Sequence, residues 1–152
     1  SNRDSKGCEM GKRVIDVWAQ NLIKQKFTWG INDCHQMLLQ FVMLHNPAWN
    51  DEQGFAKMQY STWREANTVA KTLNLPEVFT KLGYVRRAVN RVEAGDIMVA
   101  SIKNRSYDLY IPVIFGQTVL CADPSTKNIR MRHASEVDHS YEVYRRSECQ
   151  QQ

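Results

Sequence analysis

Residues 27–42 read FTWGINDCHQMLLQFV, an aromatic, glycine-containing loop that leads directly into a helix. The side-chain oxygen of Asn32 or Asp33 can cap this helix, and the apolar residues that follow Cys34 recur at helical spacing. Cys34 therefore lies in the first turn, where unpaired backbone N–H groups and the helix dipole favour a thiolate. The adjacent Asp33 opposes this effect in part. Cys34 is a candidate nucleophile, with a small buried hydrophobic residue as the alternative.

The composition of the 152 residues is that of a folded protein, with 43% hydrophobic and 24% charged residues. We expect one domain over residues 11–146, with flexible ends at residues 1–10 and 147–152. No apolar run reaches the roughly 18 residues of a membrane span, so none is expected. The polar start has no signal-peptide core, which predicts synthesis in the cytoplasm without secretion by a signal peptide.

The net charge of +4 is scattered along the sequence in short clusters, and there is no nucleic-acid-binding motif. Specific binding to nucleic acid is therefore not expected. The four cysteines are far apart and form neither a CxxC pair nor a cysteine–histidine zinc pattern, so we expect reduced thiols and no metal or other cofactor. A disulfide between Cys8 and Cys149 has no support from their spacing.

The first half of the chain has the periodicity and capping signals of helices. Pro47 disfavours helical geometry in the residue before it, which ends the cysteine helix near His45. Thr62 and Glu65 have the spacing of a capping box, and Pro76 suits the first turn of a further helix. The expected helices cover residues 11–25, 34–45, 62–74 and 76–82, with an ordered loop over residues 47–60.

Beyond Gly83 the pattern changes to short apolar runs rich in strand-forming residues. Gly116 and Gln117 separate two of these runs and suit a tight hairpin, and a helical turn is expected near Ser135. Helices followed by an antiparallel sheet indicate an α+β domain. The expected strands cover residues 97–102, 109–115, 118–122, 128–133 and 141–144.

A Trp-Gly-x-x-Asp-Cys element opens the cysteine helix, and a Gly-Asp pair opens the sheet farther along the chain. This order of parts resembles the NlpC-type branch of the papain-like cysteine peptidases. The resemblance implies a papain-like α+β fold, in which N-terminal helices pack on a C-terminal antiparallel β-sheet. It also implies that the loops around the cysteine are shaped by Trp29, Gly30, Asp33, Gly95 and Asp96.

More narrowly, the chain resembles the short members of this superfamily that are encoded among bacteriophage tail genes. In those proteins a Tyr-x-Thr-like segment, a Leu-Gly-Tyr-like segment and the Gly-Asp strand follow the cysteine loop in this order, as residues 60–62, 82–84 and 95–97 do here. The resemblance implies a virion protein made in the host cytoplasm, with other phage tail or virion proteins as partners.

In this family the cysteine attacks an amide carbonyl of cell-wall peptides, a histidine on the second sheet strand acts as base, and a polar residue on the next strand orients it. A thiol needs such a neighbouring base, and the base needs a group that fixes its tautomer. Here Tyr110 stands near the expected histidine position and Asp123 near the third position. No histidine lies between His45 and His133.

The other histidines are expected to be poor substitutes for the missing base. His35 follows Cys34 on the helix and so projects about a hundred degrees away from it. His133, at the end of a later strand, is the best remaining candidate, and His139 lies in a predicted turn. Tyr110 is a poor base at neutral pH, because an unperturbed tyrosine has a pKa of about 10.

Three hypotheses for the function follow. The first is a pseudoenzyme, a papain-like domain without efficient hydrolysis that serves as a structural or adaptor component of a phage tail or another virion assembly. The second is an active peptidoglycan endopeptidase or amidase that works during genome entry, with Cys34 as nucleophile and His133 or another base. The third is an unrelated soluble α+β binding protein. The preserved cysteine loop and the missing histidine together favour the first.

Overall fold

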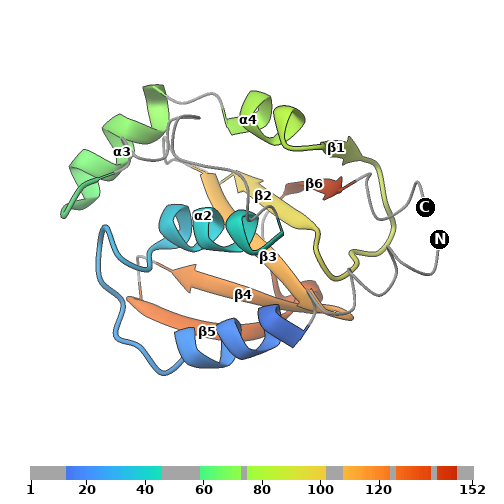
Figure 1. The fold of residues 1–152 in the computed structure, drawn as a ribbon, viewed down its shortest axis with the longest axis horizontal. Helices are drawn as coiled ribbons and strands as arrows, with labels where there is room; N and C mark the ends of the chain where they lie inside the picture. Colours follow the sequence, from blue (N-terminus) through green and yellow to red (C-terminus); the bar gives the residue numbers. More distant parts are fainter. Residues whose placement is uncertain are drawn as a thin grey trace.

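A six-stranded antiparallel sheet forms the second half of the described chain, and helices precede it (Figure 1). The computed structural model describes residues 13–45, 59–72, 75–101, 108–123, 126–137 and 140–146. Within these residues the strand order is β1-β6-β2-β3-β4-β5, so the last strand enters the sheet between β1 and β2. The predicted α+β class, with helices before an antiparallel sheet, is confirmed.

The helices lie where the sequence predicts them. The N-terminal helix covers residues 13–22. The others are α2 (Cys34–His45), α3 (Trp63–Thr72) and α4 (Leu75–Lys81). Thr62 Oγ1 accepts a hydrogen bond from the Glu65 backbone N–H at 3.2 Å and donates one to the Glu65 carboxylate at 2.9 Å. The predicted pairing of these two residues at the start of α3 is therefore present.

Most strands also match their predicted positions, with ends shifted by at most two residues. They are β2 (Ile97–Ser101), β3 (Asp108–Phe115), β4 (Thr118–Asp123), β5 (Asn128–His133) and β6 (Tyr141–Arg146). Gly116 and Gln117 form the predicted turn between β3 and β4. The predicted helical turn after β5 is a 3₁₀ turn, η3 (Ala134–Glu136).

The strand β1 (Tyr84–Arg87) is not predicted from the sequence. Only its first residue, Tyr84, is buried, so the strand has no alternation of apolar and polar residues to reveal it. It forms by pairing with β6, with Tyr84 opposite Arg146 and Arg87 opposite Val143. A strand that depends on such a distant partner leaves little local signal.

The main core lies between the helices and one face of the sheet. Helix α2 contacts β3 and β4, and its buried side includes Leu38 and Phe41. The N-terminal helix joins this core through Trp18, whose ring centroid lies 5.8 Å from that of Phe41 and whose Nε1 donates to Gln40 Oε1 at 2.8 Å. A second apolar cluster lies on the other face of the sheet, because successive strand residues point to opposite faces.

The predicted Gly95-Asp96 pair ties the start of β2 to the last strand. The carboxylate of Asp96, 1% exposed, accepts two hydrogen bonds of 2.9 Å from the Arg145 guanidinium and one of 2.7 Å from the Glu93 backbone N–H. The carboxylate beside it raises the pKa of Arg145. Gly95 also donates its backbone N–H to Val113 O on β3 at 2.9 Å. This pair therefore fixes how three strands meet.

Several predictions concern residues outside the described part of the chain. These are the flexible ends at residues 1–10 and 147–152, Cys8 and Cys149, His139, and all but the last two residues of the expected ordered loop over residues 47–60. Among the helices that are described, none has the length and apolar character needed to cross a membrane.

Removing the Arg145 side chain tests the buried ion pair. Arg145→Ala leaves the Asp96 carboxylate buried without a cation, so we expect the free energy of unfolding to fall by about 3–5 kcal/mol. Arg86→Ala is the matched control, because its 3.0 Å pair with Glu142 also joins two strands but is 67% and 52% exposed. The free energy of unfolding of this control, measured by urea unfolding, should fall by only about 0–1 kcal/mol. Equal losses in the two variants would contradict this role of Asp96.

Candidate functional site

The cysteine loop is folded by the side chain of Asn32. Asn32 Oδ1 accepts from the Thr28 backbone N–H at 2.7 Å, and Asn32 Nδ2 donates to Lys26 O at 2.9 Å. The backbone N–H groups of Ile31 and Asn32 both donate to Thr28 O at 3.1 Å. These bonds satisfy the buried amide and close the turn that precedes α2.

Gly30 lies in this loop with a positive φ of 82°, a conformation that side chains disfavour. A Cβ atom at this position would overlap the carbonyl oxygen of Tyr60. The chain before α3 therefore passes directly over Gly30, and only glycine leaves room for it. Trp29 packs edge-on against Phe27, with their ring centroids 5.2 Å apart.

The carboxylate of Asp33 is the cap of α2 and the centre of a larger network. Asp33 Oδ1 accepts from the backbone N–H groups of His35 at 3.0 Å and Gln36 at 3.3 Å. Asp33 Oδ2 accepts from the Gly30 backbone N–H at 2.8 Å, and the Tyr60 hydroxyl donates to Oδ1 at 2.6 Å. Burial alone would raise the pKa of Asp33, but the hydrogen bonds and the His35 charge lower it overall. Asp33 is therefore a buried anion.

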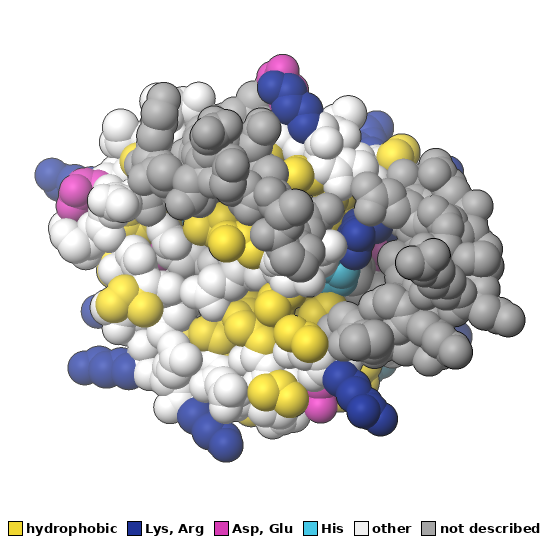
Figure 2. All heavy atoms as spheres, viewed as in Figure 1, with side chains coloured by type: hydrophobic (Ala, Val, Ile, Leu, Met, Phe, Trp, Pro, Cys, Tyr) yellow, Lys and Arg dark blue, Asp and Glu magenta, His cyan; other side chains and the backbone are white. Residues whose placement is uncertain are grey.

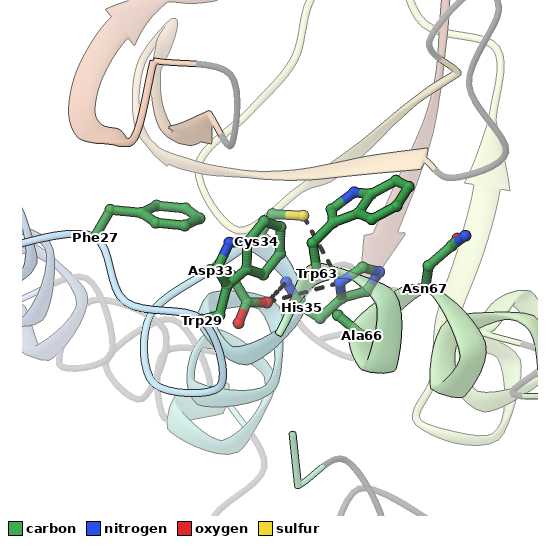
Figure 3. Close-up of a pocket in the computed structure, with 8 residues that line it drawn as sticks. All are labelled: Phe27, Trp29, Asp33, Cys34, His35, Trp63, Ala66 and Asn67. Atoms are coloured by element: carbon green, nitrogen blue, oxygen red, sulfur yellow. Dashed lines mark hydrogen bonds and ion pairs between the residues drawn. The ribbon is translucent and has the colours of Figure 1, made fainter. Parts of the chain in front are cut away.

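The structure contradicts the prediction that His35 is poorly placed to meet Cys34. Its Nδ1 lies 4.0 Å from Cys34 Sγ and 3.7 Å from Asp33 Oδ1, as Figure 3 shows. The angle between neighbouring helix positions describes where side chains leave the backbone, whereas the imidazole is long enough to turn back toward the helix start. The Asp33 carboxylate attracts it there. Three consecutive residues thus bring an acid, a thiol and an imidazole together.

The charges around His35 determine its protonation. Burial alone would lower the pKa of His35, but the neighbouring charges of Cys34 and Asp33 outweigh burial and raise this pKa to about 10. His35 is therefore an imidazolium at neutral pH. The Tyr110 ring lies 5.2 Å from the His35 ring, on the strand β3 under the start of α2. Burial first, and then the charges of Asp108 and Cys34, raise the pKa of Tyr110, so it stays neutral and cannot act as a base.

A small hollow lies beside this cluster (Figure 3). It is small, with room for about one water molecule between its walls. The cysteine loop and the start of α2 form one wall and α3 forms the other, and Cys34 itself is only 4% exposed. The residues that line the hollow are Phe27, Trp29, Asp33, Cys34, His35, Trp63, Ala66 and Asn67.

The structure brings only part of the predicted site together. Tyr110 lies near the Cys34–His35 pair, as expected of a residue on the strand under α2. Asp123 ends β4, where its carbonyl accepts from the Lys127 backbone N–H at 2.8 Å, and it does not line the hollow. Gly95 lies beside the ring of His45, at the far end of α2. That end is about 16 Å from Cys34 at 1.5 Å per helical residue. Gly95 and the neighbouring Asp96 therefore shape the sheet and not the hollow.

His133, the predicted alternative base, has a different role. It lies on the edge strand β5, where its exposed ring accepts from the Ser135 backbone N–H at 3.1 Å and caps η3. Its Nδ1 is also 2.7 Å from Ser135 Oγ. Among the histidines that the structure describes, the imidazole nearest the Cys34 sulfur is that of His35, which the sequence prediction set aside. Among the described residues no group of three or more His, Cys, Asp or Glu could hold a metal ion.

Comparisons of the chain with protein-family models, with curated proteins and with solved structures found no match. The resemblance to NlpC-type peptidases therefore stays a prediction that rests on the motifs themselves. The geometry adds that Tyr60, from the Tyr-x-Thr-like segment, bonds to Asp33 of the cysteine loop. The sequence shows both segments but has no signal that joins them, because 27 residues separate the partners.

Replacing Gly30 tests how closely the two segments approach. Gly30→Ala places a methyl group on the Tyr60 carbonyl, so we expect the free energy of unfolding to fall by about 3 kcal/mol or more. Gly116→Ala is the control, because Gly116 also has a positive φ, 51°, but an added Cβ meets no atom within 4 Å. The free energy of unfolding of this control should fall by about 1–2 kcal/mol, because its positive φ alone disfavours a side chain. If urea unfolding shows equal losses, Gly30 is not a close-contact position.

Proposed function

We propose that this protein is a structural or adaptor component of a bacteriophage tail or virion, built on a catalytically degenerate papain-like domain. The observation that carries the proposal is the neighbourhood of Cys34. The strand beneath it carries Tyr110, which the resemblance aligns near the histidine of the peptidases, and the raised pKa of Tyr110 keeps that side chain from acting as a base. The Cys34 side chain is also nearly covered.

The roles of the other motif residues support the same proposal. Asp33 holds the cysteine loop, α2 and Tyr60 together, and Gly30 lets the chain before α3 cross the loop. Asp96 holds Arg145 of the last strand. Each of these residues therefore has a structural task that is independent of hydrolysis. Selection for shape alone would retain them.

The surface supports a role in assembly. Figure 2 shows hydrophobic side chains gathered across the middle of the face that carries α2 and the N-terminal helix. Large apolar side chains that are exposed on these two helices are Val14, Val17 and Met43, and Val17 is 61% exposed. Exposed apolar side chains on two helices suit contact with a partner protein.

A second candidate function is a thiol peptidase or amidase that acts on cell-wall peptide, and the 4.0 Å contact between Cys34 Sγ and His35 Nδ1 favours it. A cation beside the sulfur stabilises a thiolate, the nucleophilic form. The thiolate would attack the amide carbonyl, and the imidazolium would give its proton to the amine that leaves when the C–N bond breaks. Water would then hydrolyse the thioester to restore the thiol.

Assays on purified cell walls separate the two candidates. We expect the intact protein to release no more peptide than Cys34→Ala, because a covered thiol without a strand-borne base does not support turnover. Mass spectrometry of the soluble fraction, over pH 5 to 9, measures the release. If release by the intact protein is lost in both Cys34→Ala and His35→Gln but kept in His133→Gln, the enzyme is active and the second candidate is correct.

The assembly role has its own test in particles of the phage that encodes this chain. Quantitative mass spectrometry of purified particles is expected to find the protein at a fixed ratio to the other tail proteins. Val17→Glu, which places a charge beside the exposed apolar side chains of the N-terminal helix, is expected to lower that ratio severalfold, whereas Thr68→Glu on the exposed side of α3 should not. Absence of the intact protein from the particles contradicts the proposal.

A further inference from the structure

The side chains of Cys34 and His35 form a buried pair at the start of α2. Cys34 Sγ lies 4.0 Å from His35 Nδ1, and this nitrogen lies 3.7 Å from Asp33 Oδ1. The other ring nitrogen, Nε2, is buried and has no hydrogen-bond partner among the described residues. The polar contacts of the ring are therefore those with the sulfur and the carboxylate, which the dashed lines in Figure 3 mark.

The imidazole of this pair carries an extra proton at neutral pH. Burial alone would lower the pKa of His35, but the charges of Cys34 and Asp33 raise it to about 10. A cation beside a thiol favours the thiolate, which is the form that reacts with oxidants. His35 thus offers the sulfur both a stabilising charge and a proton that a leaving group can take.

The hollow beside the sulfur limits what can reach it. Cys34 lines the hollow but is only 4% exposed, and the space between the walls holds about one water molecule. Trp63, in the wall formed by α3, is 40% exposed, so the hollow lies close to the protein surface. A peptide bond with its flanking residues does not fit there. Hydrogen peroxide, which has one oxygen atom more than water, is near the size that the hollow admits.

We propose that Cys34 is a site of oxidation by hydrogen peroxide, with His35 as the proton donor. The thiolate attacks one peroxide oxygen, so that an S–O bond forms as the O–O bond breaks. The hydroxide that leaves takes the proton from His35 Nδ1 and becomes water. The sulfur is oxidised by two electrons to a sulfenic acid, and the peroxide is reduced. This chemistry goes beyond the structural function and holds whether or not the protein joins an assembly.

Cys121 provides an internal comparison. It is half-buried on β4 and is therefore more exposed than Cys34. Burial, the largest effect, outweighs the charge of Arg132 and raises the pKa of Cys121 to about 11, so almost none of this thiol is ionised at neutral pH. Exposure alone therefore predicts that Cys121 is oxidised first, whereas the pair with His35 predicts that Cys34 is.

Peptide mapping of the intact protein after brief peroxide treatment at pH 7 tests the proposal. Catalase stops the reaction, the protein is unfolded in urea with excess dimedone, and mass spectrometry measures the dimedone adduct of each cysteine. We expect the Cys34 adduct to form about tenfold faster than the Cys121 adduct, or more. Cumene hydroperoxide is too bulky for the hollow and should give little Cys34 adduct. This preference for the smaller peroxide should largely disappear when the protein is unfolded before treatment.

Variants give a second measure. His35→Gln keeps a polar side chain but removes the cation, so the Cys34 adduct should form about tenfold more slowly. His133→Gln is the matched control, because His133 caps η3 and does not line the hollow. This control should leave the rate at Cys34 unchanged.

The proposal is overturned if Cys34 forms no adduct, if its adduct forms no faster than that of Cys121, or if the preference between the two peroxides is the same in folded and unfolded protein. An unchanged rate in a folded His35→Gln would also overturn it. Should His35→Gln not fold, the comparisons of the two cysteines and of the two peroxides in the intact protein decide the matter alone.

Discussion

The buried carboxylate of Asp33 is the constraint on which the rest of the site depends. It receives hydrogen bonds from the start of α2, from Gly30 in the preceding loop and from Tyr60 before α3. An anion that is removed from water must be compensated, and each of these donors comes from a different segment. Asp33 therefore couples the local fold of the loop to the position of α3.

The same carboxylate explains why His35 turns toward Cys34. A comparison within α2 illustrates this effect. His45, at the other end of the helix, is half-buried, and this burial and the charge of Arg146 lower its pKa to about 4, despite a 3.0 Å contact with Phe41 O. His35 has Asp33 and Cys34 beside it and its pKa rises to about 10. At neutral pH His35 is therefore charged and His45 is neutral, because only His35 faces an anion.

Features with local signals could be predicted from the sequence. The turn at Gly116, the pairing of Thr62 with Glu65 and the helix beginning at Cys34 depend on neighbours in the chain, and all are present. Features that depend on residues far away in the sequence could not be predicted. The strand beginning at Tyr84 needs β6, and the bond from Tyr60 to Asp33 joins residues far apart in sequence.

The position of His35 shows a different limit. The angle between neighbouring helix positions predicts that the His35 side chain points away from Cys34. This rule omits the Asp33 carboxylate at the helix cap, which attracts the imidazole. The resemblance predicts Asp123 near the third site position, and His133 is predicted as a substitute base only because the expected strand carries no histidine. In the structure His133 instead caps a 3₁₀ turn, and Asp123 closes the turn after β4. The sequence thus singles out Asp33 and Cys34, but it does not predict that the His35 side chain lies beside them.

Asp33 maintains a buried charged pair with His35 at the start of α2. A ¹⁵N titration of the histidine side chains from pH 3.5 to 10.5 tests it most directly. We expect His35 to be an imidazolium at every pH well below about 10 and His45 to become charged only near pH 4. Asp33→Asn should move the His35 pKa toward its ordinary value of 6.5. If His35 titrates near 6.5 in the intact protein, with no change in Asp33→Asn, Asp33 does not hold a charged pair with His35.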